Sequence, residues 1–233
     1  MEFLTITPSP DNAPWLLRHA SERRLTREDA VARLRHLPPP GHVVGFAGVV
    51  NPRYSAVLIP IGDLDGEAAV AVTQRPQTMR NHRDMWVFPG GRFDPGVDAS
   101  TRDTAVREGS EELGFHADDI RIVGQLNTRG PISSGFMLDV YVAQVDFAQL
   151  SPDPREVADC AVARISALAS EAAYSESHDL PEFDVGPTAE GVVLPSGRLD
   201  RRIRFFQVKP GVQMWGLQGD MLHELLSCLL PAP

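Results

Sequence analysis

Three glutamates at helical spacing, directly downstream of a strand-like segment that ends in two glycines, constrain this chain more than any other feature. Residues 107–114 read Arg-Glu-Gly-Ser-Glu-Glu-Leu-Gly. In a helix, Glu108, Glu111 and Glu112 lie within one turn of each other, so their carboxylates repel unless a cation lies among them. Carboxylate oxygens of this kind select Mg²⁺ or Mn²⁺, the ions that bridge phosphate oxygens. A solvated acidic helix face is the alternative interpretation of the glutamates alone.

The residues that flank the glutamates predict a helix with defined ends. Residues 100–103, Ser-Thr-Arg-Asp, fit a capping box, and Gly114 fits a left-handed stop. We therefore expect a helix from Thr101 to Leu113. Arg107 precedes Glu111 by four residues, where its planar fork can hold a carboxylate in place and leave other oxygens free for a metal.

The segment before this helix predicts a ligand-binding loop. Residues 85–88, Met-Trp-Val-Phe, read as a short buried strand that leads into Pro89-Gly90-Gly91. Two glycines let the backbone bend and approach a ligand closely. We assign the carbonyl of Gly90 to the metal shell and Gly91 to substrate binding. Strand, glycine loop and acidic helix form one predicted unit, which favours a metal site over a solvated face.

The glycine loop and the acidic helix resemble the Nudix hydrolase box, Gly-x5-Glu-x7-Arg-Glu-U-x-Glu-Glu-x-Gly-U, in which U is a bulky aliphatic residue. The second half matches at Arg107, Glu108, Glu111, Glu112, Gly114 and Phe115. In the first half, the loop Arg92 to Ser100 carries two extra residues, and Val97 or the neighbouring Asp98 replaces the glutamate. Gly109 stands at a U position, where a mid-helix glycine costs up to about 1 kcal/mol and removes a packing contact. The resemblance implies an α/β fold, the Nudix α/β/α sandwich with a mixed β-sheet.

A second signature precedes the box. Within the Nudix proteins, coenzyme A diphosphatases carry Leu-Leu-Thr-x-Arg-[Ser/Ala]-x3-Arg-x3-Gly-x3-Phe-Pro-Gly-Gly, and residues 71–91 keep every spacing of this pattern. Pro76 stands where serine or alanine is usual, and Asp84 stands where glycine is usual. Arg75 and Arg80 match its two arginines. The resemblance implies that both bind substrate phosphates, for which a planar fork suits paired oxygens, and a structural salt bridge is the alternative role.

The resemblance also implies an activity. It points to a Mg²⁺- or Mn²⁺-dependent hydrolase that splits the pyrophosphate of coenzyme A or its thioesters into 3′,5′-ADP and 4′-phosphopantetheine. Cations held by the glutamates would neutralise phosphate charge and activate the attacking water. We assign Glu108 and Arg107 to the catalytic set, with Glu108 as the general base. Asp139, Glu156 and Glu182 are the alternative bases, on more distant segments.

Three other functions are kept as alternatives. The first is a pyrophosphatase for another nucleoside diphosphate derivative, such as ADP-ribose or a dinucleotide, because Asp84 and the lengthened loop depart from the pattern. The second is a non-catalytic Nudix domain that binds a nucleotide as a sensor. Such proteins commonly lose acids of the second half of the box, whereas this chain keeps all three. The third is a dimerisation module without a ligand.

Composition favours one domain that acts on a small anionic molecule. No repeat or long linker divides the 233 residues, and the net charge of −9 argues against a general nucleic-acid binder. The chain shows no membrane-spanning apolar stretch and no secretory signal pattern. Cys160 and Cys228 lack zinc or redox spacing, which suits a reduced cytoplasmic protein. We expect a small nucleotide substrate as the partner, without nucleic acid or membrane.

We divide the chain into an N-terminal extension, residues 1–53, and a Nudix hydrolase domain, residues 54–233. The extension contains a predicted amphipathic helix from Thr26 to Leu37. We interpret this extension as a dimer arm, which would make the protein a homodimer, or as a cover over the core.

Strands are predicted at Ser55 to Pro60, Ala68 to Gln74, Trp86 to Phe88, Ile120 to Asn127, Met137 to Val145 and Ala158 to Arg164. They are followed by a predicted helix at Ser166 to Ala173, a loop at Ser175 to Gly191, a hairpin of Val192 to Leu194 with Arg202 to Val208, and a closing helix at Gly219 to Leu230. Trp215, just before that helix, is interpreted either as a nucleobase-stacking residue or as a core residue that pins the helix.

Overall fold

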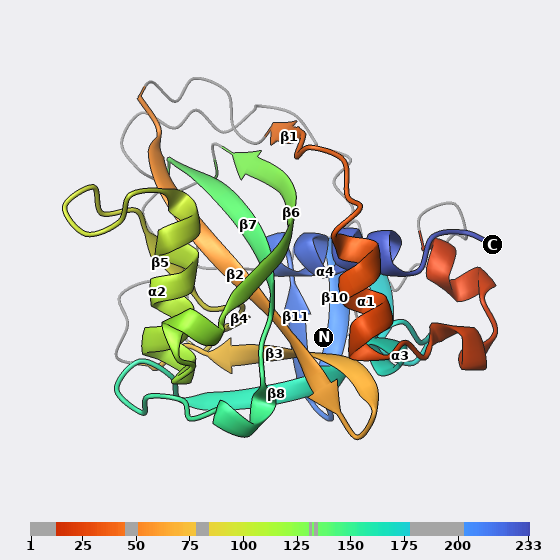
Figure 1. The fold of residues 1–233 in the computed structure, drawn as a ribbon. Coiled ribbons are helices and arrows are strands. Elements are labelled where there is room, and N and C mark those ends of the chain that lie inside the picture. Colours follow the sequence, from red (N-terminus) through yellow and green to blue (C-terminus); the bar gives the residue numbers. More distant parts are fainter. Residues whose placement is uncertain (1–12, 45–50, 78–83, 131, 133–134, 178–202) are drawn as a thin grey trace.

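The computed structural model describes residues 13–44, 51–77, 84–130, 132, 135–177 and 203–233 (Figure 1). Its largest element within these ranges is a mixed eight-stranded sheet, in the order β1-β6-β7-β2-β3-β4, with β5 paired to β2 and β8 to β3. The strands are β1 (His42–Val44), β2 (Arg53–Leu64), β3 (Glu67–Gln74), β4 (Trp86–Val87), β5 (Gly90–Arg92), β6 (Arg121–Gly130), β7 (Phe136–Gln144) and β8 (Asp159–Arg164). The β1/β6 and β2/β7 pairs are parallel and the others are antiparallel, as expected for a mixed sheet.

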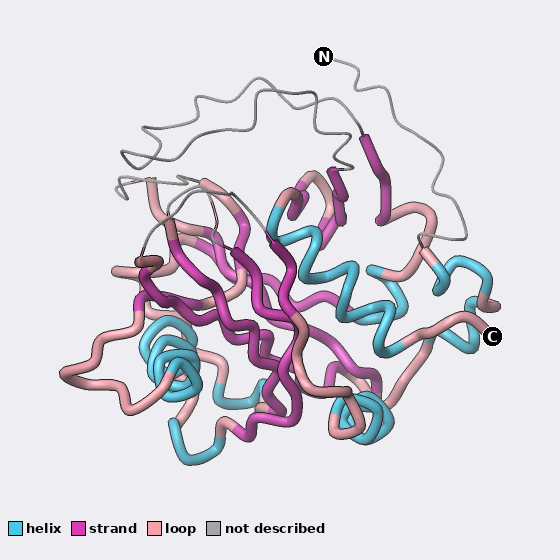
Figure 2. Tube along the Cα trace, turned by 90° about the horizontal axis from the view of Figure 1, so that it is seen from above, coloured by secondary structure: helices cyan, strands magenta, loops and turns pink. Residues whose placement is uncertain are grey.

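Helices cover both faces of this sheet. Helix α2 (Thr101–Leu113) lies on one face, and α1 (Arg27–Leu34) and α4 (Leu217–Leu229) lie on the other (Figures 1 and 2). Alternate residues of β2 point to opposite faces, so Leu58 belongs to the core under α2 and Ile59 to the core under α1 and α4. The predicted α/β/α sandwich is therefore confirmed.

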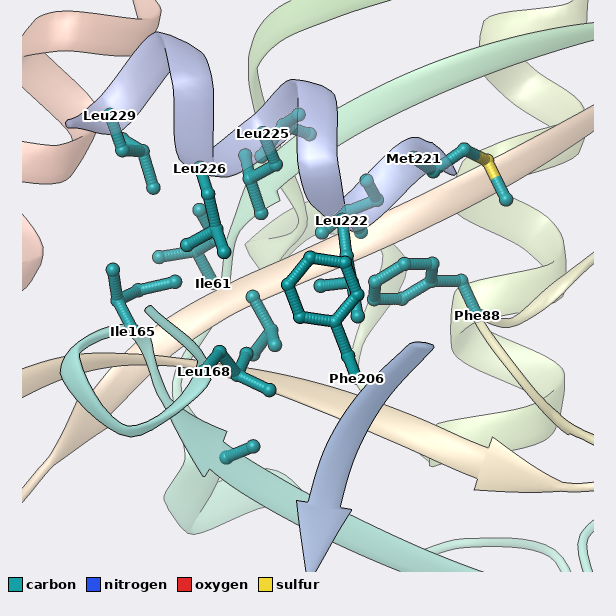
Figure 3. Close-up of a cluster of buried hydrophobic side chains, with 14 of the residues drawn as sticks. Ile61, Phe88, Ile165, Leu168, Phe206, Met221, Leu222, Leu225, Leu226 and Leu229 are labelled. Atoms are coloured by element: carbon teal, nitrogen blue, oxygen red, sulfur yellow. The ribbon is translucent and has the colours of Figure 1, made fainter. Parts of the chain in front are cut away.

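A second, three-stranded sheet extends the larger core. Strand β10 (Ile203–Lys209) pairs with β9 (Tyr174–Ser177) and with β11 (Val212–Trp215), in both cases antiparallel. Figure 3 shows Phe206 of β10 among the leucines of α4, with Phe88 alongside. Because Phe88 begins the glycine loop, the core itself holds the start of that loop. The remaining described elements are short helices: η1 (Pro14–Leu17), η2 (Ala20–Arg23), η3 (Ala117–Asp119), η4 (Phe147–Gln149) and α3 (Ile165–Leu168).

The described part of the N-terminal extension packs into the larger core. Trp15 is fully buried, with its ring centroid 5.4 Å from that of Tyr174 and 4.9 Å from that of His223. The Leu25 carbonyl accepts a hydrogen bond of 2.7 Å from the Ala68 amide at the start of β3. These contacts support a cover over the core, while a role in dimer formation stays a prediction. No helix among the described residues is long and apolar enough to cross a membrane.

The local signals around the acidic helix are confirmed at both ends. Helix α2 begins at Thr101 and ends at Leu113, and the Ser100 side chain accepts a hydrogen bond from the Asp103 amide. Gly114 adopts the left-handed conformation, with φ 75°, and its amide donates to the Ser110 carbonyl. Cap and stop therefore act as the sequence predicted.

Two predictions beyond residue 164 are wrong in extent, and a third falls partly outside the described residues. The helix predicted at Ser166 to Ala173 is the four-residue α3, and the loop predicted from Ser175 begins as strand β9. Residues 192–194 of the predicted hairpin lie outside the described ranges. The described residues hold a hairpin that was not predicted, in which β10 joins β11 through a turn at Gly211, whose φ is 76°. A proline and a glycine at 210 and 211 are the turn signal that reveals this hairpin.

Candidate active site

The two glycines of the loop allow β5 to lie close to both β2 and α2. A Cβ atom at Gly90 would lie 2.5 Å from the carbonyl oxygen of Ala56. A Cβ atom at Gly91 would lie only 2.1 Å from Oε1 of Glu108. Since no Cβ atom tolerates such distances, glycine at 91 is what lets the Glu108 carboxylate rest against the loop backbone.

A third glycine sets the distance between α2 and the sheet. A Cβ atom at Gly109 would lie 2.4 Å from Cδ2 of Leu58 on β2. The sequence predicted a lost packing contact at this position, whereas Leu58 fills the space that a side chain would occupy. Gly109 therefore brings the acidic helix closer to the sheet than the usual bulky residue would.

Arg107 connects the acidic helix to the loop that precedes it. Its Nη1 donates to Oε1 of Glu108 at 2.8 Å and to Oε2 of Glu111 at 2.9 Å. Its Nη2 donates to the Arg92 carbonyl at 3.3 Å. The predicted Arg107–Glu111 contact is thus confirmed, and a single guanidinium orients two of the three candidate metal ligands.

Asp98 is the acidic partner of Arg107 in the first half of the box. Its two oxygens accept from Nε and Nη2 of Arg107 at 2.9 and 3.1 Å, and it also accepts from Thr104 Oγ1 at 2.9 Å. The Arg107 hydrogen bonds lower the pKa of the Asp98 carboxyl to about 2, in spite of its burial. Val97 is 68% exposed. Of the two residues considered at this position, Asp98 therefore takes the place of the glutamate.

The three glutamates differ in their surroundings. Glu112 is 7% exposed, and its Oε1 accepts a long hydrogen bond of 3.4 Å from the Gly90 amide. Burial raises the pKa of Glu112 to about 8, and burial also raises the pKa of Glu108, against the hydrogen bond from Arg107. The Glu111 side chain is half-exposed. The site thus holds two carboxylates away from water and leaves one at its rim.

Arg75 and Glu156 reach this site from other segments. After burial, the smaller influences on the pKa of Glu112 include the charge of Arg75, which lowers it, and that of Glu156, which raises it. The turn that carries Glu156 is fixed to the end of α2, because the Asp153 amide donates to the Glu112 carbonyl at 3.1 Å. At the end of β3, the Arg75 amide donates to the Met85 carbonyl at 3.0 Å. The charges of Arg75 and Glu156 therefore lie close enough to Glu112 to act on its ionisation.

Asp139 is held at a different place. It accepts hydrogen bonds from Thr101 Oγ1 at 2.7 Å and from Thr128 Oγ1 at 2.6 Å. Thr101 begins α2, so it lies about two helical turns, or roughly 10 Å, from Glu108 along the helix axis. Asp139 thus braces the start of α2 and does not join the carboxylates. Glu182 and Arg80 lie outside the described residues.

Asp84 has a conformational reason to occupy a glycine position. Its φ is 57°, in the left-handed region that glycine adopts freely and that aspartate tolerates better than most residues. Its Oδ2 accepts from Nε2 of Gln77 at 3.2 Å, and its carbonyl accepts from Nε2 of Gln74 at 3.4 Å. The departure from the signature therefore keeps the backbone geometry that glycine would provide.

The sequence did not reveal that α4 supports the glycine loop. Oε1 of Gln218, in the first turn of α4, accepts a hydrogen bond of 3.1 Å from the Phe88 amide. Phe88 and Gln218 are 130 residues apart in the chain, and no spacing rule links them. Trp215 is partly buried, with its ring centroid 6.4 Å from that of Phe205, which favours packing over base stacking.

The donor set fits a hard divalent cation in kind. Among the described residues, no three acidic, histidine or cysteine side chains are arranged as a complete metal-binding cluster, and Arg107 draws the carboxylates of Glu108 and Glu111 toward itself. The donors are nevertheless all oxygens, Glu108 lies against Gly91, Glu112 accepts from the Gly90 amide, and Glu112 is buried where a cation would favour its charged form. The residues are thus suited to Mg²⁺ or Mn²⁺.

Comparisons with known proteins show which family the chain resembles. The family model of the NUDIX domain matches residues 52–181. Nudix hydrolase 3 of Caenorhabditis elegans is 31% identical over 186 residues, which cover 76% of this chain and 73% of that protein. A Photorhabdus laumondii protein named uncharacterized Nudix hydrolase NudL is 29% identical over 205 residues, 86% of this chain and 96% of that protein. A crystal structure of a MutT/nudix family protein from Enterococcus faecalis covers 82% of this chain and 63% of its own, with a TM-score of 0.46 and 16% identity.

Proposed function

This chain belongs to the Nudix hydrolase family, and from that premise we propose that it cleaves the pyrophosphate bond of coenzyme A or its thioesters, giving 3′,5′-ADP and 4′-phosphopantetheine. The substrate assignment is argued from two positions of the coenzyme A diphosphatase signature, residues 71–91. The charge of its first arginine, Arg75, lies close enough to the buried Glu112 to lower the pKa of that carboxyl, and position 84 keeps a glycine-like backbone. The positions of Arg75 and Asp84 are therefore compatible with phosphate binding by the signature residues.

We propose Mg²⁺ or Mn²⁺ as the cofactor, with Glu108, Glu111, Glu112 and the Gly90 carbonyl as its ligands. When bound, such an ion neutralises phosphate charge and makes a water molecule more acidic. The surrounding residues supply position and proton transfer. Arg107 holds Glu108 and Glu111 in fixed orientations, and Gly91 lets the Glu108 carboxylate lie against the loop backbone.

Substrate binding and proton transfer fall to separate residues in this proposal. Arg75, and Arg80 outside the described residues, bind the phosphates through paired hydrogen bonds. Glu108 accepts the proton of the attacking water, because it is partly buried and its pKa is raised by that burial. Glu156 is the alternative base, since its charge acts on Glu112 from a turn that is anchored to the end of α2.

The proposed setting is a reduced compartment. Cys160 and Cys228 are free thiols, and burial raises the pKa of each to about 11, so neither is a ready nucleophile or metal ligand. We therefore retain a cytoplasmic location as part of the proposal. A small nucleotide derivative is the expected partner.

The decisive experiment is a hydrolysis screen of the purified protein with coenzyme A, ADP-ribose and NADH, with and without Mg²⁺ or Mn²⁺, and with products identified by mass. We expect 3′,5′-ADP and 4′-phosphopantetheine from coenzyme A only when metal is present. Cleavage of ADP-ribose or NADH with none of coenzyme A would overturn the substrate and leave a Nudix pyrophosphatase. Binding without turnover of any of them would favour a nucleotide sensor.

Two glutamine substitutions test the metal ligands. Glu111→Gln and Glu112→Gln keep side-chain volume and remove charge, so each should lower metal-dependent hydrolysis by about a hundredfold or more while the protein still folds. The matched control is Glu171→Gln, at an exposed position away from the site. Near wild-type turnover of either site variant at saturating Mg²⁺ would show that the metal assignment is wrong.

A comparison of Glu108→Gln with Glu156→Gln identifies the general base. Protonation of the base at low pH lowers kcat, so only the variant that lacks the base should lose this fall of kcat.

A further inference from the structure

Three successive residues of the glycine loop are held from three different elements. The Phe88 amide donates to Oε1 of Gln218 on α4 at 3.1 Å. The Pro89 carbonyl accepts from a backbone amide of β2 at 2.9 Å. The Gly90 amide donates to Oε1 of Glu112 on α2 at 3.4 Å. The loop is thus fixed at one residue after another, and α4 supplies the first of these contacts.

The Phe88 amide needs the acceptor that α4 provides. Phe88 is 2% exposed, so water has little access to its backbone. Its side chain belongs to the same buried cluster as Met221 and Leu222 of α4 (Figure 3). A buried amide that loses its acceptor is costly, so the loop would shift to find another one. Because Phe88 lies only two residues before Gly90, such a shift would move the Gly90 backbone as well.

The first two turns of α4 are anchored to neighbouring strands. A Cβ atom at Gly219 would lie 2.3 Å from the Arg204 carbonyl, so glycine lets α4 approach β10 closely. Asp220 forms an ion pair of 2.7 Å with Arg204. Glu224 forms an ion pair of 2.5 Å with Arg129 of β6, whose side chain is buried. These contacts fix the backbone from which the glutamine side chain reaches the glycine loop.

We propose that Gln218 is a positioning residue for the candidate metal site. It acts through Phe88: it fixes the start of the glycine loop, and the loop sets the place of the Gly90 carbonyl relative to the three glutamates. The inference rests on the proposed function, in which that carbonyl is a metal ligand. Loss of the acceptor should therefore weaken metal binding and lower kcat more than it raises KM, because Gln218 acts on the loop and not on the substrate.

Two substitutions separate the acceptor from the bulk of the side chain. Gln218→Leu keeps a similar volume and removes the acceptor, whereas Gln218→Glu keeps an oxygen acceptor. The matched control is Gln213→Leu, at an exposed glutamine of β11. Binding of Mn²⁺ without substrate is measured from the electron paramagnetic resonance signal of the free ion. We expect Gln218→Leu to bind Mn²⁺ about tenfold more weakly, and Gln218→Glu and the control to stay within about twofold of the wild type.

Hydrogen exchange of the backbone amides of residues 88–91 separates failure of this inference from failure of the proposed function, since it needs neither metal nor substrate. We expect exchange about tenfold faster in Gln218→Leu than in the wild type, Gln218→Glu and the control, as for the loss of one hydrogen bond. Equal effects of the two Gln218 substitutions would overturn the inference. Faster exchange with wild-type Mn²⁺ affinity and kcat would also overturn it, because Gln218 would then be structural alone.

The wild type itself tests the proposed function. A wild type that binds no Mn²⁺ and cleaves none of the substrates would overturn that function, and the exchange rates would still decide whether Gln218 fixes the loop. Urea unfolding of each variant shows that it is folded under the conditions of the binding and exchange measurements.

Discussion

At the scale of single residues, Arg107 determines how the acidic site is organised. Its guanidinium has five N–H donors in a fixed plane. Nε and both Nη atoms donate to Asp98, Glu108, Glu111 and the Arg92 carbonyl. One planar group therefore relates the loop before α2 to the carboxylates on it. A lysine at the same place has a single charged centre and could not span these acceptors.

The buried Asp98–Arg107 pair should matter for stability in a manner that depends on pH. Asp98→Asn should lower the free energy of unfolding at pH 7 by about 1–3 kcal/mol, the range for hydrogen bonds to charged groups. Because the pKa of Asp98 is lowered to about 2, below its ordinary value of 3.8, this stabilisation is present above about pH 4 and is lost as the pH falls toward 2. Urea unfolding at pH 7 and at pH 3 measures the difference between variant and wild type.

The matched control for this prediction is Asp118→Asn, at an exposed carboxylate on η3. It should unfold like the wild type at both pH values. A stability difference for Asp98→Asn that stays constant from pH 7 to pH 3 would contradict a charged pair and would indicate a packing effect alone.

At the scale of elements, the sequence predicted those features that depend on neighbouring residues. Helix α2 has a capping serine and a terminating glycine within its own segment, so both of its ends were predictable. Strand β11 was not predicted, since it is four residues long and gains its stability by pairing with β10. The contact of Gln218 with the Phe88 amide depends on two elements that meet only in the folded chain.

In the candidate site, too, features that depend on local spacing were predictable and features that depend on the folded chain were not. Spacing identified the glutamates and Arg107, because a helix fixes which residues share a face. Spacing could not choose between Val97 and Asp98, because two extra residues in the loop shift the alignment with the pattern. Only the folded loop shows that Asp98 is the buried residue that bonds Arg107. The sequence showed Asp84 only as a departure from the signature, whereas the structure shows that it shares a left-handed backbone with glycine.

The left-handed conformation of Asp84, in the connection between β3 and β4, leads to a prediction about substitutions. Asp84→Val should lower the free energy of unfolding by about 1–2 kcal/mol, because a β-branched residue is strained in the left-handed region. Asp84→Gly should stay within about 1 kcal/mol of the wild type, since relief of strain offsets the lost Gln77 hydrogen bond and the greater freedom of the unfolded chain. Urea unfolding measures both variants. If Asp84→Val is as stable as Asp84→Gly, the left-handed assignment at this residue is wrong.

At the scale of the whole molecule, one sheet separates two cores with different tasks. The smaller core lies under α2 and positions the acidic helix. The larger core joins α1, α4 and the second sheet, and it also takes up Phe88 at the start of the glycine loop (Figure 3). The loop thus lies between the two cores and is positioned by both. Substitutions that disrupt the larger core should therefore also displace the glycine loop, because Phe88 belongs to both.

A substitution in the N-terminal extension tests whether this extension is part of the larger core. Trp15 is fully buried against Tyr174, Phe206 and His223, so Trp15→Ala should lower the free energy of unfolding by about 3–5 kcal/mol, as is usual for loss of a buried tryptophan. Val97→Ala, at a side chain that is 68% exposed, is the control and should change stability by less than about 0.5 kcal/mol. Urea unfolding gives the free energies, and limited proteolysis shows which part of the chain is released. A detachable arm would give a different result: proteolysis would remove the first 53 residues and leave a remainder that unfolds at the wild-type urea concentration.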